Sequence, residues 1–178
     1  NGTIVRWVLK DTQGKLIGRI AAFTNNKYKN KGDDVPVGGI GFFDCINNQD
    51  AANLLLDTAK NWLAEKGMAA MDGPINFGNR DRWWGLLLEG FENEPNYLCN
   101  YNFPYYKNFF EAYGFQVYFY QLTFHRSVAG PLSPKLAIKA EMAAKDPDYE
   151  FRHLRKEELK NLAEYIHTVY NKAWANRF

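Results

Sequence analysis

Alternating apolar and polar residues predict strands in the first part of the chain. Val5–Lys10 and Leu16–Thr24 have this pattern, and Asp11-Thr12-Gln13-Gly14 between them has the turn chemistry of a β-hairpin. Val37–Cys45 is apolar at successive positions, which is typical of a strand buried on both faces in the middle of a sheet. Its three glycines weaken the strand propensity and indicate a bulge or the close approach of another backbone.

The apolar positions then change to helical spacing. Residues 48–66 carry one apolar stripe, formed by Leu55, Ala59, Trp62 and Leu63. The helix has three candidate caps, Asn47, Asn48 and Asp50, and Gly67 is placed to end it. A strand that runs through a short polar turn into a helix leaves free backbone N–H groups at one point, where a phosphate can bind.

The middle of the chain predicts shorter elements of both kinds. Met68–Met71 is a short strand, Trp83–Leu88 a brief helix, and Tyr105–Tyr113 a longer helix that ends at Gly114. Phe115–His125 alternates as a final strand would. This order of elements predicts an α/β fold, with a mixed central sheet flanked by helices.

The C-terminal part has a different organisation. Residues 127–147 form a linker interrupted by glycine and proline, and it contains a predicted helix at Leu136–Lys145. A strand at Tyr149–Leu154 and a helix at Glu157–Ala175 follow. The chain begins with Asn-Gly instead of Met and ends within this last helical pattern, so we expect it to be truncated at both ends.

Length and charge limit the possible functions. A chain of 178 residues is long enough for one domain, or for one domain and part of another, and 46% hydrophobic residues can build a core. The charges nearly balance, with 22 Lys and Arg against 20 Asp and Glu. A net charge of +2 gives no argument for binding to DNA, RNA or an anionic membrane.

Residues that hold metals or form disulfides are few. Cys45 and Cys99 are far apart, and the three histidines do not cluster, so the spacing predicts no metal site. Such cysteine usage is typical of a reduced, cytoplasmic protein. No apolar run approaches the roughly 20 residues of a membrane span, and no signal peptide is found.

Several stretches resemble the GNAT superfamily of N-acetyltransferases. Leu16–Ala22 resembles their third strand, which has a glycine between hydrophobic residues. Val37–Cys45 resembles their fourth strand, which splays from its neighbour to admit the pantetheine arm of CoA. Tyr105–Phe115 resembles their aromatic helix, which closes on Gly-Phe. Three further stretches resemble a poorly characterised bacterial subgroup of acetyltransferase-like proteins: residues 72–76, 85–91 and 104–106.

The resemblance implies a domain organisation. Residues 1–126 would be an acyl-CoA N-acyltransferase-like domain whose opening strand and helices are missing. Residues 127–147 would be the linker. Residues 148–178 would be either the first strand and helix of a second such domain or a segment that completes the sheet. The partner surfaces expected from this are tandem packing within one chain or a homodimer.

The resemblance also implies acetyl-CoA or another acyl-CoA as co-substrate. The implied binding residues run from the end of the fourth strand into the helix, with one more after the next strand: Cys45, Ile46, Asn47, Asn48, Gln49, Asp50, Ala51, Ala52 and Asn76. Asn47 replaces an arginine or glutamine of the family pattern, and Asp50 stands in place of a glycine. The Asp50 carboxylate would repel a phosphate, since two unit charges about 4 Å apart cost roughly 4 kcal/mol at an effective dielectric constant of about 20.

Two residues are candidates for acid–base chemistry. Asp44, at the end of the strand, is placed to act as general base toward an amine, with a turn or cap residue as the alternative. Phe110 stands where many members of the superfamily have the tyrosine that protonates the leaving thiolate. Tyr106, one helical turn earlier, is the remaining candidate acid, with packing as its alternative. The loop at residues 47–52 has the alternative of a helix start without a ligand.

Three functions are consistent with these residues. The first is an acyl-CoA-dependent N-acyltransferase that transfers an acetyl or acyl group to a small-molecule or peptide amine. The second is a non-catalytic GNAT-like domain, with a degenerate CoA loop, that serves packing or protein interaction. The third resembles the aminoacyl-tRNA-dependent aminoacyltransferases of cell-wall synthesis, and it would need a basic surface that the charge balance does not support.

Overall fold

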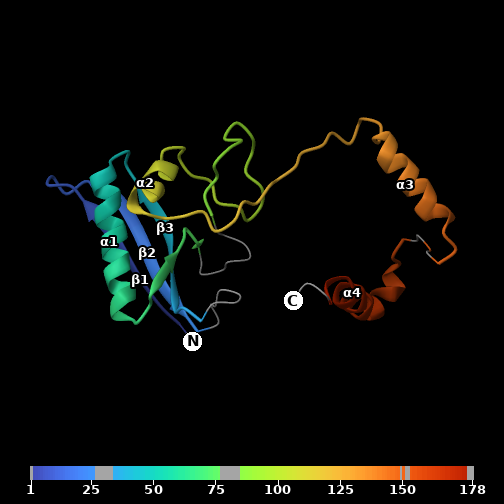
Figure 1. The fold of residues 1–178 in the computed structure, drawn as a ribbon, viewed down its shortest axis with the longest axis horizontal. Coiled ribbons are helices and arrows are strands. Elements are labelled where there is room, and N and C mark those ends of the chain that lie inside the picture. The colour runs from blue at the N-terminus through green and yellow to red at the C-terminus, as the bar shows by residue number, and fades with distance from the viewer. Residues whose placement is uncertain (1, 27–33, 77–84, 149, 151–152, 176–178) are drawn as a thin grey trace. The chain divides into compact units, whose positions relative to one another are not determined.

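The computed structural model describes residues 2–26, 34–76, 85–148, 150 and 153–175. The chain separates into two compact units, residues 1–120 and residues 121–178. The first unit contains the sheet and two helices, and the second contains the remaining helices (Figure 1). Among the described residues, no helix is both long enough and apolar enough to cross a bilayer.

A four-stranded sheet forms the centre of the first unit. Its strands are β1 (Gly2–Lys10), β2 (Leu16–Asn25), β3 (Val37–Cys45) and β4 (Ala70–Asp72), in the order β1-β2-β3-β4. The first three are antiparallel neighbours, and β4 pairs in parallel with β3 (Figure 1). The predicted hairpin, the third strand and the α/β fold with a mixed sheet are confirmed.

Helix α1 (Gln49–Glu65) packs on one face of this sheet. Five apolar side chains of the helix are at most 3% exposed: Ala52, Leu55, Leu56, Ala59 and Leu63. Full burial of such a leucine contributes roughly 1.5–3 kcal/mol. Trp62, also predicted in the stripe, is half-buried and contacts Trp7 edge to face, with ring centroids 6.2 Å apart.

Both ends of α1 follow from local chemistry. Asn48 is the cap, because its Oδ1 accepts a hydrogen bond from the backbone N–H of Ala51 at 2.9 Å. At the other end the helix stops at Glu65, just before Gly67, whose φ of +77° suits glycine. The N–H of Met68 still bonds to the Leu63 carbonyl, so β4 begins two residues later than the predicted strand.

The predicted bulge lies near the end of β3. Arg19 pairs with Asp44 and Ala21 pairs with Gly41, so Ile20 on β2 faces two residues, Phe42 and Phe43, on β3. Phe42 has a φ of +49°, in the left-handed region that non-glycine residues rarely adopt. Such a conformation costs of order 1–3 kcal/mol and persists only where surrounding contacts hold it.

The second glycine prediction, a close backbone approach, is also confirmed. A Cβ on Gly41 would overlap the backbone carbonyl of Ile75. The chain after β4 therefore lies directly against β3, where the N–H of Ile75 donates to the carbonyl of Ile40 at 2.6 Å. A side chain at position 41 would separate the two segments.

Helix α2 (Tyr106–Tyr113) packs beside the end of β3. It ends at Gly114 as predicted, with a φ of +107°. Its buried residues are Tyr106, Phe109 and Phe110. The ring of Phe43 meets Tyr106 and Phe110 edge to face, each at a centroid distance of 5.1 Å. These aromatic contacts fix α2 against the strand.

Two predicted elements of the first unit differ from the structure. Residues 85–88 of the expected Trp83–Leu88 helix are not helical, and the first two residues of that range lie outside the described residues. Phe115–His125, expected as the final strand, has no strand structure. Its alternation is real, but a strand also needs a ladder partner, and several apolar residues here remain exposed, Phe124 by 86%.

The second unit contains α3 (Pro134–Lys145), a short 3-10 helix (Lys156–Glu158) and α4 (Leu159–Trp174). Both predicted helices are confirmed, and the first begins earlier than predicted because Ser133 caps it and Pro134 fits its first turn. For the predicted strand Tyr149–Leu154, residues 150, 153 and 154 are irregular and the others lie outside the described residues. The assignment of this part to a second domain stays a prediction.

Candidate functional site

Strands β3 and β4 part before β3 ends. Their ladder runs only from Val37 and Ala70 to Gly39 and Asp72. Beyond it, the N–H of Phe42 donates not to a strand but to the side-chain Oδ1 of Asn76, at 2.7 Å. The last residues of β3 therefore form no ladder with β4 on this side of the strand.

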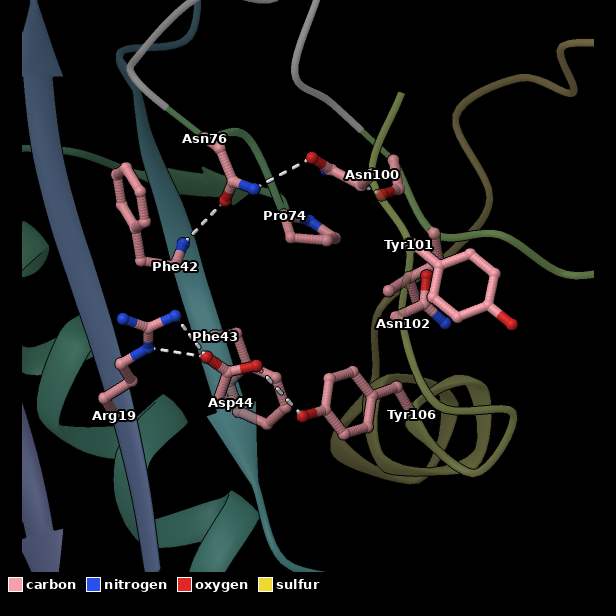
Figure 2. Close-up of a pocket in the computed structure, with 12 residues that line it drawn as sticks. Arg19, Phe42, Phe43, Asp44, Pro74, Asn76, Asn100, Tyr101, Asn102 and Tyr106 are labelled. Carbon is pink, nitrogen blue, oxygen red and sulfur yellow. Dashed lines mark hydrogen bonds and ion pairs between the residues drawn. The ribbon is translucent and has the colours of Figure 1, made fainter. Parts of the chain in front are cut away.

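A pocket of about 160 Å³ lies beside this edge (Figure 2). The end of β3, the chain after β4, the segment at residues 85–102 and the start of α2 enclose it. Its lining residues are Arg19, Phe42, Phe43, Asp44, Pro74, Asn76, Gly85, Leu86, Asn100, Tyr101, Asn102 and Tyr106. Three of the predicted site residues, Asp44, Asn76 and Tyr106, therefore come together here.

The Asp44 carboxylate lies between a cation and a phenol. The Nε and Nη2 atoms of Arg19 both contact its Oδ2 atom, and the Tyr106 hydroxyl donates to its Oδ1 atom over 3.4 Å (Figure 2). The side chains of Arg19 and Asp44 are 58% and 54% exposed, so this ion pair contributes at most about 1 kcal/mol to stability. Its main effect is to hold the carboxylate in one orientation at the pocket.

The bulge explains why Asp44 is accessible. In an unbroken strand the side chains of residues 42 and 44 would share a face with Ile40, which is fully buried. The extra residue at Phe42 shifts this alternation, so Phe43 and Cys45 are buried and Asp44 is exposed. The strained backbone at Phe42 thus directs the carboxylate of Asp44 toward the pocket.

Tyr106 is buried and stays protonated at neutral pH. Burial is the largest effect on its pKa, which is raised to about 12; the hydrogen bond from the Cys45 N–H lowers it, and the charge of Asp44 raises it further. Only 3% of the residue is exposed. The phenol can donate a proton but cannot serve as a base near pH 7.

Asn76 connects the strand to the aromatic segment. Its Nδ2 donates to Oδ1 of Asn100 at 2.8 Å, while its Oδ1 holds the Phe42 N–H. Asn100 and Asn102 in turn bond to the backbone of Gly85 and Leu87 at 2.7 to 3.2 Å. Arg19, Asn100 and Asn102 were not among the site residues predicted from the sequence. The alternation of Asn100 and Asn102 on one face of an extended segment was the only available signal.

Two tyrosine hydroxyls form hydrogen bonds with the backbone of Cys45. Its N–H donates to the Tyr106 hydroxyl and its carbonyl accepts from the Tyr105 hydroxyl, each at 3.0 Å. The thiol is buried, and burial raises its pKa, which disfavours the reactive thiolate. Cys45 therefore acts in the structure through its backbone and its packing.

The other predicted cofactor-binding residues lie at the start of α1. Ile46, Asn47, Asn48 and Asp50 are exposed, whereas Ala51 and Ala52 are buried in the core. Of the described residues around the pocket, none comes from this helix start. Gln49 instead spans to α2, since its Nε2 donates to the Phe109 carbonyl at 3.4 Å. The structure thus separates the predicted phosphate loop from the pocket with Asp44.

An acyl-CoA can be tested against these residues. An extended amide chain such as pantetheine would pair with the backbone N–H and C=O groups at the edge of β3. Those of Phe42 and Cys45 are already hydrogen-bonded to the side chains of Asn76, Tyr105 and Tyr106. At the helix start, Asn48 takes the Ala51 N–H, and Asp50 adds a negative charge in the first turn. The residues in this arrangement do not fit a bound acyl-CoA, and its binding stays a prediction.

Within the described residues, no group of three or more His, Cys, Asp or Glu side chains is placed to hold a metal ion.

Comparison with known proteins places only limited constraints on function. No family model matches the chain. Protein YghO of Escherichia coli K12 is 30% identical over 110 residues, which is 61% of this chain and 27% of the relative. The chain thus spans about a quarter of the length of that relative, whose name states no function.

One solved structure is similar at the level of the backbone. It is a proposed acetyltransferase of Pyrococcus furiosus, with a TM-score of 0.42 and 14% identity, and the match covers 72% of this chain and 68% of that one. This similarity is too weak to carry an argument about function. Membership of the GNAT superfamily and of its bacterial subgroup stays a prediction, and the functional argument rests on the pocket.

Proposed function

We propose that residues 1–120 form an N-acyltransferase domain in which Asp44 binds an amine acceptor and removes its proton. The observation that supports this most is the bulge at Phe42, which turns the Asp44 side chain toward the pocket where β3 and β4 have parted. The amine would enter as an ammonium ion, which a carboxylate attracts. Its proton would pass to a carboxylate oxygen of Asp44, leaving a neutral nitrogen with a lone pair for attack.

The rest of the pocket would orient the acceptor. Arg19 holds the carboxylate in place, and Asn76, Asn100 and Asn102 line the pocket with carboxamide groups. At about 160 Å³ the pocket is smaller than the roughly 300–1,000 Å³ of pockets that enclose a whole ligand. We therefore expect it to take the amino group and adjoining atoms of a larger molecule, such as a small-molecule or peptide amine.

Tyr106 would contribute as a neutral hydrogen-bond donor. With a pKa of about 12, its proton is present throughout the physiological range, but it is a weak acid toward a thiolate. Phe110, the position of the family's tyrosine, is 4% exposed and packs on Phe43 and Phe115. Of the two positions, only Tyr106 can hold a proton near the reacting atoms.

A non-catalytic domain is the second candidate. It is favoured by the capped edge of β3 and by Asp50 at the helix start, both of which disfavour the implied acyl donor. In that case the pocket would bind a polar group of a partner without chemical change. Binding of an amine without turnover separates this candidate from the first.

The experiment compares wild type with Asp44→Asn, which removes the base and keeps the size of the side chain. The assay measures release of CoA thiol from acetyl-CoA in the presence of a panel of amines. General-base loss predicts a decrease of about 100-fold or more in the rate constant of transfer. Asp34→Asn, the same change at an exposed position, is the control and should match wild type. An unchanged rate in Asp44→Asn would show that Asp44 is not the base.

A further inference from the structure

A second hollow lies on the face of the sheet opposite α1. Side chains alternate along β1, and Trp7 contacts Trp62 of α1, so Arg6 and Val8 point to the other face. The hollow there has a volume of about 800 Å³, within the roughly 300–1,000 Å³ of pockets that enclose a whole ligand. Ile4 and Val8 line it and are both more than half exposed. This face therefore offers apolar contact to a ligand.

The charges in this hollow are positive. Among the described residues that line it, the charged ones are Arg6 and Arg19. Asp44 neutralises Arg19, whereas within the described part of the chain no carboxylate pairs with the exposed Arg6. The Arg6 guanidinium is therefore available to an anionic group. Its planar fork of N–H donors matches the two oxygens of a carboxylate.

This hollow adjoins the pocket with Asp44. Arg19 and Phe42 line both of them. Among the described contacts, Arg19 uses Nε and Nη2 on Asp44, so its Nη1 is left to donate to a carbonyl oxygen (Figure 2). A molecule that lies across Arg19 thus meets a carboxylate at one end, an N–H donor in the middle and a cation at the other end.

The strand register sets the spacing of these groups. Arg19 pairs with Asp44 on β3 and with Val8 on β1, and Arg6 lies two residues before Val8. Strand spacing and rise place Arg6 and Asp44 roughly 10 Å apart across the sheet and 7 Å along it, or about 12 Å in all. A single amino acid spans only about 3.5 Å, whereas two or three extended residues span at most about 7–11 Å. With contacts of about 3 Å at each end, the peptide bridges the two side chains and the amino acid does not.

We propose that the acyl acceptor is a short peptide with free ends, which binds across the sheet with its amino group at Asp44 and its carboxylate at Arg6. The proposal rests on the acyltransferase function above, because it names the acceptor class for the same Asp44 site. Arg19 Nη1 donates to a carbonyl of the peptide, and Ile4 and Val8 contact its side chains. A free carboxylate thus distinguishes this acceptor from a simple amine.

The experiment measures binding without an acyl donor. The whole chain and its Arg6→Gln variant are titrated calorimetrically with the tripeptide alanyl-leucyl-alanine, first with free ends and then amidated at the C-terminus. Loss of the charge-assisted bonds predicts about tenfold weaker binding of the free-ended peptide by Arg6→Gln. Binding of the amidated peptide should be the same in both proteins. Because Arg6 is exposed, the variant should keep the near-UV circular dichroism of wild type.

Lys10→Gln is the matched control. It removes an exposed cation from the same strand, but Lys10 does not line the hollow. This variant should bind both peptides as wild type does. Free leucine is the control for length, since it carries both charged groups and is too short to bridge them. Its binding should be unaffected by Arg6→Gln.

Three results would overturn the proposal. They are equal binding of the free and amidated peptides by wild type, equal losses in Arg6→Gln and Lys10→Gln, and no binding of either peptide at millimolar concentration.

The outcomes also separate this proposal from the proposed function. Binding that depends on Arg6 and on the carboxylate, without transfer to the peptide, would support the peptide site and count against the acyltransferase. Transfer to amines that is lost in Asp44→Asn, but is indifferent to a carboxylate on the amine and to Arg6→Gln, would do the reverse.

Discussion

Gly41→Ala tests whether the approach of the chain after β4 builds the pocket. The new Cβ would overlap the carbonyl of Ile75, and backbone atoms cannot move aside as a side-chain end can. Overpacking of this kind costs about 1–3 kcal/mol. Separation of the segments would also weaken the bonds from Ile75 to Ile40 and from Phe42 to Asn76, each worth about 1 kcal/mol. Alanine also restricts the unfolded chain more than glycine does, which offsets roughly 0.5–1 kcal/mol of this loss in stability.

These terms predict a loss of about 2–3 kcal/mol in the free energy of unfolding, measured by urea denaturation followed by circular dichroism. The matched variant is Gly38→Ala on the same strand, where the three atoms nearest to the new Cβ all belong to the side chain of Leu63. Both variants should lose stability, but only Gly41→Ala should speed amide exchange at Phe42. Equal exchange at Phe42 in both variants would refute the claim that Gly41 positions Asn76.

Two further predictions concern the cap and the buried phenol. Asn48→Ala should lower the free energy of unfolding by about 1 kcal/mol, because the Ala51 N–H loses its acceptor, whereas Asn47→Ala should change it by less than about 0.5 kcal/mol; equal losses would contradict the assigned cap. Tyr106 has a folded pKa of about 12, above its ordinary value near 10, so its contribution to stability is complete below pH 10 and is lost as the pH rises through 12. Urea denaturation across this range should therefore show a shallower alkaline loss in Tyr106→Phe than in wild type, and identical slopes would contradict the raised pKa.

Local sequence chemistry was sufficient for much of the first unit. The bounds of β3 and the stop at Gly114 each depend on residues within a few positions of one another. For the cap of α1 the sequence left three candidates, of which the structure selects Asn48. The three glycines of β3 also predicted the bulge and the close approach of another backbone segment, because few other features explain three glycines in a buried strand.

The pocket could be predicted only in part, because its contacts join distant residues. Tyr106 reaches Cys45 across 61 positions, and Asn76 reaches Asn100 across 24. Sequence pattern indicated Asp44, and the family resemblance implied Asn76 and Tyr106, but neither predicted their meeting with Arg19 and Asn100. The expected strand at Phe115–His125 was wrong for the same reason, since alternation shows that a segment can pair and not whether a partner is present.

The most direct test of the account asks whether transfer depends on the Asp44 carboxylate. The rate of acetyl transfer to a reactive amine is measured in wild type, in Asp44→Asn and in the control Asp34→Asn. The account predicts transfer by wild type and by the control, and a loss of about 100-fold or more in Asp44→Asn. Equal rates with and without Asp44→Asn would contradict the central claim that the bulge at Phe42 presents a catalytic base.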